Sequence, residues 1–378
     1  MICKEKKIFI VANCTWYLYN FRYDLLKRLF NKGYKIIVIS TKDNYYQNIS
    51  KYIFKFENLF LIRGSENPIL ELITLFNLLI LYLKYKPLFI HHFTIKPCLY
   101  GSIIARLTCS KKIINQITGL GPSLYSQRLK LKLLNSFLFP LYKYAFNNKN
   151  TLNIFHNISD KNTFIKKKFT SKNQTLIIPG SGVDVDYFKR KKFKKIYQKD
   201  IQILFPARLI EQKGILELID ACEELWFEGY KFRLNVAGEI DKQNRTFLKG
   251  KNLNKLCNKN INVLGKTNNI LNVYNNTDFI VLPSWREGLS KSLLEAASMS
   301  LPIITTDVPG CREVIKDKYS GLLVPPRNKN KLRLAIKTFL DNPDLAIEYG
   351  NRAREGVLGE FSLKNINNQI INIYENYF

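Results

Sequence analysis

Histidine and paired cysteine, the usual ligands of structural metals, are scarce in this sequence. The 378 residues include three histidines, two of them adjacent at His91 and His92, so a histidine-based metal site is not expected. The seven cysteines are scattered, odd in number and without a Cys-x-x-Cys pair, which argues against a zinc cage or a disulfide framework. We therefore expect no metal cofactor and a reducing, cytoplasmic environment.

Acidic residues are also few, and their scarcity is uneven. The chain has 59 Lys or Arg against 30 Asp or Glu. Residues 1–180 carry 28 basic and 7 acidic side chains, whereas residues 181–378 carry 31 and 23. A general bias toward lysine would explain the total but not this asymmetry. The basic first half predicts an anionic partner, which could be nucleic acid, anionic lipid or a pyrophosphate substrate.

A signal peptide is not expected, because the charged start "MICKEKKIFIVAN" leads into an apolar run of only strand length. Solenoid repeats and low-complexity tracts are not evident either. The chain is longer than the roughly 250 to 300 residues at which one hydrophobic core stops growing. Two domains are therefore expected.

Short apolar runs alternate with helix-length amphipathic stretches, and the series starts twice. The first series includes "KKIFIVAN" and "YKIIVIS", and the second includes "IQILFPARL" and "DFIVLPS". This alternation is typical of parallel sheets covered by helices, so the predicted fold class is α/β with two Rossmann-like domains facing each other across a cleft. We place the domains at 1–180 and 181–360, followed by a C-terminal helix at 361–378, with 179–188 as linker.

Two glutamates, Glu287 and Glu295, bracket a short run that opens like a helix just after the apolar run "FIVLP". Eight residues apart on a helix, they would differ by about 80° in azimuth and about 12 Å in rise, too far to share a proton. They are instead suited to different parts of one elongated ligand. Free backbone N–H groups of Gly288, Leu289, Ser290 and Lys291 would face a phosphate between them.

The wider context of this run resembles a known family. The segment "SWREGLSKSLLEAASMSLPIITTDVPGCREVIKDKYSGLLVPPRN" is similar to the nucleotide-sugar signature of retaining glycosyltransferases of family four, and "FPARLIEQKGI" resembles the Arg and Lys pair of that family. The segments "IPGSGVDVDYF", "NCTWYLYNFRYDLLKRL" and "QITGLGPSLYS" resemble the bacterial branch that elongates lipid-linked glycans. The resemblance spans essentially the whole chain and implies the GT-B fold.

The resemblance implies a role for each motif residue. Arg208 and Lys213 would neutralise the departing nucleoside diphosphate, and Glu287 would hold hydroxyls of the transferred hexose. Glu295 would accept hydrogen bonds from the ribose hydroxyls of the nucleotide. Lys266 lies in the loop "GKTNNI", expected to contact the donor, where the family commonly has an aspartate at the position of Asn269.

Residues of the first domain are candidates for both substrates. Gly119 in "TGLG" would let the backbone approach the donor, or would only form a tight turn. Asn13, Cys14 and Thr15 follow the first strand and are expected to seat the acceptor. The adjacent histidines are read as structural, and "DVD" at 184–186 follows a glycine in the linker, so neither is expected to hold a metal.

The function predicted from this resemblance is retaining transfer of a hexose or N-acetylhexosamine from a UDP-sugar to a polyprenyl-diphosphate-linked acceptor. The UDP-sugar is the donor substrate, and no metal is required. Two alternatives stay open. A nucleic-acid-binding protein would use the basic half, although no known nucleic-acid module accompanies the charge. A UDP-sugar epimerase would keep the fold but needs further acid and base groups near the sugar.

Two apolar segments bear on membrane association. Residues 68–83 are shorter than the ~20 apolar residues of a membrane span, so we predict a packed helix. Residues 128–146 interleave basic and apolar residues, which predicts a helix lying in the membrane interface. Its basic side chains, facing anionic headgroups, would be Arg128, Lys130, Lys132 and Lys143. This places the protein on the cytoplasmic face of the plasma membrane, bound peripherally.

Overall fold

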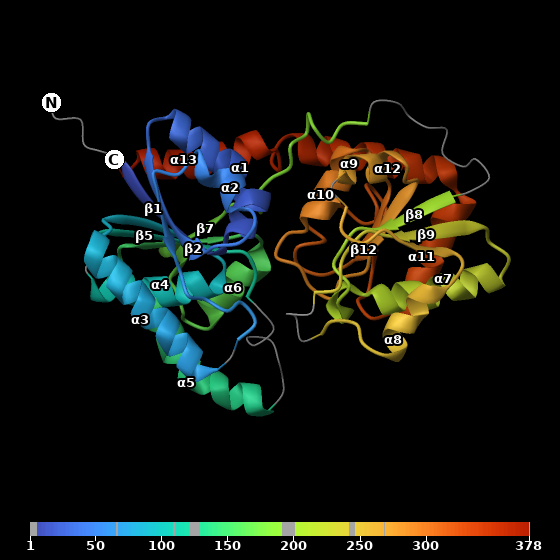
Figure 1. The fold of residues 1–378 in the computed structure, drawn as a ribbon. Coiled ribbons are helices and arrows are strands. Elements are labelled where there is room, and N and C mark those ends of the chain that lie inside the picture. Colours follow the sequence, from blue (N-terminus) through green and yellow to red (C-terminus); the bar gives the residue numbers. More distant parts are fainter. Residues whose placement is uncertain are drawn as a thin grey trace. The chain divides into compact units, whose positions relative to one another are not determined.

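The computed structural model describes residues 6–65, 67–108, 110–120, 129–190, 201–241, 246–267 and 269–377. The chain divides into two compact units, each an α/β structure with helices against its sheet (Figure 1). Unit 1 comprises Met1–Ser181 and Ile366–Phe378, and unit 2 comprises Gly182–Asn365. The boundary at Ser181 falls within the turn-rich segment 179–188.

Unit 1 is built on a seven-stranded sheet in the order β3-β2-β1-β4-β5-β6-β7, in which neighbouring strands are parallel. Its strands are β1 (Lys7–Cys14), β2 (Lys35–Thr41), β3 (Lys55–Asn58), β4 (Phe89–Phe93), β5 (Lys112–Ile117), β6 (Thr151–Phe155) and β7 (Thr175–Ile177). The order reverses between β1 and β4, as in doubly wound folds.

Helices cover both faces of this sheet because alternate residues of its strands point to opposite sides. The helices are α1 (Thr15–Asn31), α2 (Tyr46–Ser50), α3 (Pro68–Tyr85), α4 (Ile95–Leu107), α5 (Leu129–Phe146), α6 (Ile158–Lys166) and α13 (Leu363–Glu375). In β1, Ile8 and Ile10 pack in one cluster with residues of α1 and α13. Phe9 and Val11 pack in another cluster with residues of α3 and α4.

Unit 2 repeats the plan with a six-stranded parallel sheet in the order β10-β9-β8-β11-β12-β13. Its strands are β8 (Ile201–Phe205), β9 (Phe232–Val236), β10 (Ile261–Val263), β11 (Phe279–Leu282), β12 (Ile303–Thr306) and β13 (Leu322–Val324). Its helices are α7 (Ile215–Phe227), α8 (Lys251–Asn254), α9 (Ile270–Asn275), α10 (Lys291–Ser298), α11 (Lys329–Asp341) and α12 (Pro343–Leu358).

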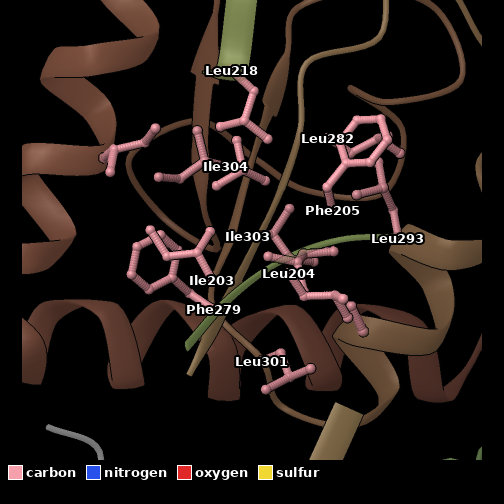
Figure 2. Packing of buried hydrophobic residues seen from close by; sticks show 14 of the residues in the cluster. Ile203, Leu204, Phe205, Leu218, Phe279, Leu282, Leu293, Leu301, Ile303 and Ile304 are labelled. Carbon is pink, nitrogen blue, oxygen red and sulfur yellow. The ribbon is translucent and has the colours of Figure 1, made fainter. Parts of the chain in front are cut away.

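The core of unit 2 lies at its central strands. Figure 2 shows side chains of β8, β11 and β12 packed with side chains of flanking helices. The labelled residues include Ile203, Leu204, Phe205, Phe279, Leu282, Ile303 and Ile304, together with Leu218 of α7 and Leu293 of α10. Burial of these continuous apolar strands on both faces fixes the carboxyl ends of β8 and β11 next to each other. The predicted α/β class is confirmed.

The predicted helix at residues 68–83 packs against unit 1 through one side only. The segment is helical, as α3, but only 22% of its 18-residue apolar window is buried. A helix lying on a sheet hides one stripe of its surface, so apolar residues all round it cannot all be covered. Within the described residues, α3 is the one helix that is long and apolar enough to cross a membrane, judged by length and composition.

The predicted basic helix at 128–146 corresponds to α5. Arg128 lies outside the described residues, as do the side chains of Lys130 and Lys132. Lys143 is exposed in the last turn of the helix, whereas Tyr142 is buried in a cluster with residues of α4 and α6. Its interfacial role stays a prediction.

Candidate functional site

The carboxyl ends of β8 and β11 meet where the strand order of unit 2 reverses. β8 is hydrogen-bonded to β9 on one side and to β11 on the other. Loops that leave two adjacent parallel strands in opposite directions open a crevice at the carboxyl edge, the usual ligand position in such sheets. Arg208 and Lys213 follow β8, and Glu287 follows β11, so the topology brings three predicted residues to this edge.

Glu287 is held by its own loop and by the loop after β8. Its Oε1 accepts a hydrogen bond from Ser284 Oγ at 2.7 Å and one from Lys213 Nζ. Its backbone N–H donates to the carbonyl of Pro309 at 3.1 Å. The side chains of Glu287 and Lys213 are 12% and 16% exposed, so the pair is largely shielded but not fully buried. A fixed carboxylate beside a fixed ammonium can bind hydroxyls and an anion of one ligand.

The position of Lys213 depends on the glycine that follows it. Lys213 ends a short 3₁₀ turn, and Gly214 has φ +74°. A Cβ on Gly214 would overlap the backbone carbonyl of Pro283, the residue after β11. Glycine is therefore required for the two loops to approach and for Lys213 to reach Glu287.

Gly310 supports Glu287 from the loop after β12. It has φ +83°, and a Cβ there would lie 2.6 Å from the backbone carbonyl carbon and oxygen of Glu287. Its N–H donates to Glu313 Oε2 at 2.6 Å, and its carbonyl accepts from the N–H of Ser290 at 3.0 Å. One backbone segment thus fixes both Glu287 and the start of α10.

Gly310→Ala should displace the Glu287 loop and destabilise unit 2 by about 1–3 kcal/mol, from the unfavourable φ together with the close approach. Gly229→Ala is the control, because Gly229 has φ +95° but nothing within 4 Å of the added Cβ. Thermal unfolding of the two variants should show the larger fall in Tm for Gly310→Ala. Equal falls would mean that the contact with Glu287 is not required.

Arg208 pairs with a residue that sequence reasoning missed. Its guanidinium donates to Asp241 Oδ2, with side-chain exposures of 40% for Arg208 and 11% for Asp241. The loops that carry them, after β8 and β9, lie in close contact, since a Cβ on Gly238 would overlap the carbonyl of Ala207. Asp241 thereby orients a cation that stays partly open to solvent.

Glu295 lies one turn inside α10 and is 8% exposed. Its Oε2 accepts from the hydroxyl of the buried Tyr274 at 3.0 Å, and Lys291 Nζ lies 3.6 Å from Oε1. Burial raises the pKa of Glu295, although Lys291 and Tyr274 favour its ionised form. Further donors from a bound ligand would offset the remaining desolvation of this carboxylate.

One of the backbone groups predicted to face a phosphate at the start of α10 is already engaged, because the N–H of Ser290 donates to the carbonyl of Gly310 at 3.0 Å. Ser290 is the N-cap residue, and its side chain accepts from the N–H of Leu293 at 3.5 Å. Gly288, Leu289 and Lys291 are partly exposed around it. Lys266 is exposed beyond β10. Since β10 is three strands from β11, Lys266 lies on the same edge but about 14 Å along it, at ~4.8 Å per strand.

The candidates in unit 1 lie at the corresponding edge of its own sheet. Asn13 and Cys14 end β1 and are partly exposed. Thr15 is buried, and its hydroxyl donates to Asp43 Oδ1 at 2.5 Å, so it holds the β1–α1 turn in place. Gly119 follows β5 and is partly exposed.

The adjacent histidines are fully buried in β4. His92 is bonded through Nε2 to the Tyr82 hydroxyl and through Nδ1 to Asn115 Oδ1, each at 2.8 Å. Burial lowers the pKa of His92 to about 4 and that of His91 well below its usual range. Both rings are neutral at physiological pH and pack inside unit 1, which agrees with the structural interpretation.

Acidic residues of the linker serve the backbone. The carboxylate of Asp184 accepts from the N–H groups of Asp186 and Tyr187, at 3.2 and 3.0 Å. In the part of the chain that the structure describes, three or more His, Cys, Asp or Glu side chains are nowhere grouped as metal ligands would be.

Comparisons with known proteins cover both units. Residues 186–356 match the family model "Glycosyl transferases group 1", and residues 7–157 match "Glycosyl transferase 4-like". Unit 2 thus matches one model and unit 1 another over most of their lengths.

Curated relatives span nearly the whole chain. An N,N'-diacetylbacillosaminyl-diphospho-undecaprenol α-1,3-N-acetylgalactosaminyltransferase of Campylobacter jejuni is 27% identical over 351 residues, covering 90% of this chain and 91% of that one. An N-acetylgalactosamine-N,N'-diacetylbacillosaminyl-diphospho-undecaprenol 4-α-N-acetylgalactosaminyltransferase of the same organism is 29% identical, covering 77% and 79%.

Solved structures share the fold. A glycosyltransferase of Rickettsia africae superposes with a TM-score of 0.75 at 20% identity, covering 98% of each chain. The Anabaena protein HepE in complex with UDP gives 0.77 at 16% identity, covering 98% of this chain and 100% of that one. The chain belongs to the group 1, or family four, glycosyltransferases of GT-B fold, a family of retaining hexosyltransferases that use nucleotide sugars.

Proposed function

We propose that the protein transfers an N-acetylhexosamine or hexose, with N-acetylgalactosamine as the first candidate, from a UDP-sugar to a polyprenyl-diphosphate-linked glycan. The contact between Lys213 and Glu287 at the strand reversal of unit 2 carries the proposal. It pairs an ammonium suited to a diphosphate with a carboxylate suited to sugar hydroxyls. The choice of sugar and acceptor rests on the names of the two Campylobacter relatives.

In this proposal the donor diphosphate binds between Arg208, Lys213 and the N–H groups at the start of α10. The acceptor hydroxyl attacks the anomeric carbon from the side of the leaving group, and a donor phosphate oxygen takes the hydroxyl proton. The bond from the anomeric carbon to the diphosphate breaks, and UDP leaves. The cations stabilise the charge that develops on the diphosphate, so no metal is needed.

Unit 2 would bind the donor and unit 1 the acceptor. Asn13 and Cys14 at the end of β1 would contact the acceptor glycan, with Thr15 holding their turn. Gly119 would bring backbone close to the donor. The protein would work on the cytoplasmic face of the plasma membrane, where the basic side chains of α5 attract anionic headgroups.

Product analysis tests the proposal. Purified protein is incubated with UDP-GalNAc, UDP-GlcNAc, UDP-galactose or UDP-glucose in EDTA, with and without a polyprenyl-diphosphate-linked monosaccharide. We expect UDP release and a product heavier by one sugar, only when acceptor is present. Conversion of the UDP-sugar without acceptor would instead identify an epimerase, and salt-sensitive binding of random DNA without transfer would favour a nucleic-acid-binding protein.

Glu295→Ala should weaken UDP binding by about tenfold or more, because a buried carboxylate that accepts ribose hydroxyls is worth about 1.5–3 kcal/mol. Tyr274→Phe should weaken it less, since it removes only one donor that orients Glu295. Isothermal titration with UDP measures both variants. Glu348→Ala is the control, because that side chain is 51% exposed in α12. Unchanged UDP affinity in Glu295→Ala would remove Glu295 from the site.

A further inference from the structure

Helix α3 carries an exposed apolar stripe along its whole length. Six of its large apolar side chains are between 45% and 67% exposed. They are Ile69, Leu72, Ile73, Phe76, Ile80 and Leu83. At 100° per residue these positions fall within a band about 100° wide. The surfaces of monomeric soluble proteins rarely carry so many exposed apolar side chains side by side.

The opposite side of α3 is fixed to unit 1. Thr74, Leu78, Leu81 and Tyr82 are buried, and the last three pack in the cluster that includes Phe9 of β1. The helix therefore cannot leave the sheet to cross a bilayer without opening this core. It can only lie flat, with the stripe facing outward; Figure 1 shows α3 running along the outside of the sheet.

The segment before α3 extends the apolar surface. Phe60 and Ile62 are 40% and 46% exposed. The N–H of Phe60 donates to Asn77 Oδ1 of α3 at 3.1 Å, and Lys96 Nζ donates to the carbonyl of Ile62 at 3.0 Å. The only acidic residue of α3, Glu71, is paired with Lys96 at 2.6 Å, so its charge is neutralised beside the stripe.

Basic side chains flank the stripe at the C-terminal end of α3. Lys84 and Lys55 are 56% and 47% exposed around a single carboxylate, that of Glu57, and Lys86 is exposed at the helix end. Phe54 beside them is 61% exposed. An apolar band with a cationic margin matches the interface of an anionic bilayer, in which acyl chains lie below negative headgroups.

We propose that α3 is the element that inserts unit 1 into the interface of an anionic membrane, with Phe76 at the centre of the inserted stripe. The purpose of this docking rests on the proposed function, since a polyprenyl-linked acceptor lies in the bilayer. A second copy of the chain fits the surface less well, because self-association would bring the same lysines and the same basic domain together. The basic charges of α5 would assist docking, whereas α3 supplies the apolar contact.

Vesicle flotation of the full chain tests the proposal. Wild type should float with vesicles of phosphatidylcholine and phosphatidylglycerol, and a bound fraction should persist in high salt because apolar contact is not screened. Leu72→Ser/Phe76→Ser/Ile80→Ser should lower the floating fraction at least about fivefold. The matched control is Phe227→Ser/Leu334→Ser/Leu358→Ser, which changes exposed apolar residues of unit 2 and should float like wild type.

Phe76→Trp gives a second, independent readout. The fluorescence added by the introduced tryptophan should shift to shorter wavelength when vesicles are present and should be quenched by lipids brominated near the headgroup. Normal flotation of the α3 triple variant, or absence of both fluorescence changes, would overturn the proposal. A wild-type dimer that the triple variant converts to monomer, with no flotation of either, would assign the stripe to self-association instead.

Transfer to a water-soluble, short-chain acceptor separates this inference from the proposed function. The α3 triple variant should retain wild-type activity in that assay and lose activity with long-chain acceptor in vesicles. Flotation without any sugar transfer would contradict the proposed function and support the docking of α3. Transfer to both acceptors without flotation would contradict the docking of α3 and support the proposed function.

Discussion

Lys213→Ala should lower kcat/KM at least about a hundredfold, with little change in Tm. The ammonium is fixed by Glu287 and by the turn at Gly214, so it is preorganised for charge that develops on the departing diphosphate. Losing one such fixed donor costs about 2.7–4 kcal/mol of transition-state stabilisation. Arg208→Ala should have a comparable effect, because its partner Asp241 orients it without covering it. Steady-state kinetics with donor and acceptor varied separately provides the measurement.

Lys255→Ala is the matched control for this prediction. Lys255 also pairs with a carboxylate of unit 2, that of Asp220 on α7, but the two side chains are 38% and 35% exposed. Its removal should leave kcat/KM within about twofold of wild type, as for most surface ion pairs. Activity of Lys213→Ala within threefold of wild type would exclude Lys213 from the catalytic machinery.

Glu287→Gln should lower kcat by about a hundredfold while leaving UDP affinity nearly unchanged. The substitution keeps the shape and can still contact Ser284, but it removes the charge that pairs with Lys213 and that would accept hydroxyls of the transferred sugar. Hydrogen bonds to sugar hydroxyls that strengthen in the transition state raise kcat, and their loss does not change the affinity for the nucleotide. Kinetics with saturating donor, together with UDP titration, distinguishes the two effects.

A double-mutant cycle with Lys213→Ala extends this test. Because Glu287 and Lys213 are in direct contact, their effects should be non-additive by about 0.5–3 kcal/mol. A tenfold loss of UDP affinity in Glu287→Gln with unchanged kcat would place Glu287 in nucleotide binding instead. Full additivity would show that the contact between the two side chains does not matter for transfer.

Much of the fold could be predicted because apolar strands and amphipathic helices alternate in the sequence. That alternation also places Glu287 and Lys213 after apolar strands, whereas the pairing of those two strands is seen only in the sheet order. The partners of the site residues were not predictable in this way. Asp241 lies 33 residues after Arg208, and Tyr274 lies 21 residues before Glu295. Such contacts depend on how loops from different strands meet, which no local pattern encodes.

The extent to which α3 is covered was not predictable for a related reason. Its sequence correctly indicates an apolar helix, but hydrophobicity alone does not say how much of the helix surface the rest of the unit covers. The sheet and α4 cover one side, while Phe76 and its neighbours remain outside. Membrane contact by α5 can be tested by substitution of Lys143, the basic side chain of that helix among the described side chains.

The stereochemistry of transfer from UDP-GalNAc to a polyprenyl-diphosphate-linked acceptor decides whether this chain is a retaining glycosyltransferase of lipid-linked glycans. Proton NMR of the released disaccharide reports the anomeric configuration through the coupling constant of the new linkage. We expect an α-linked product, which retains the donor configuration, formed in EDTA and lost in Lys213→Ala. A β-linked product, or no transfer from any UDP-sugar under these conditions, would contradict it.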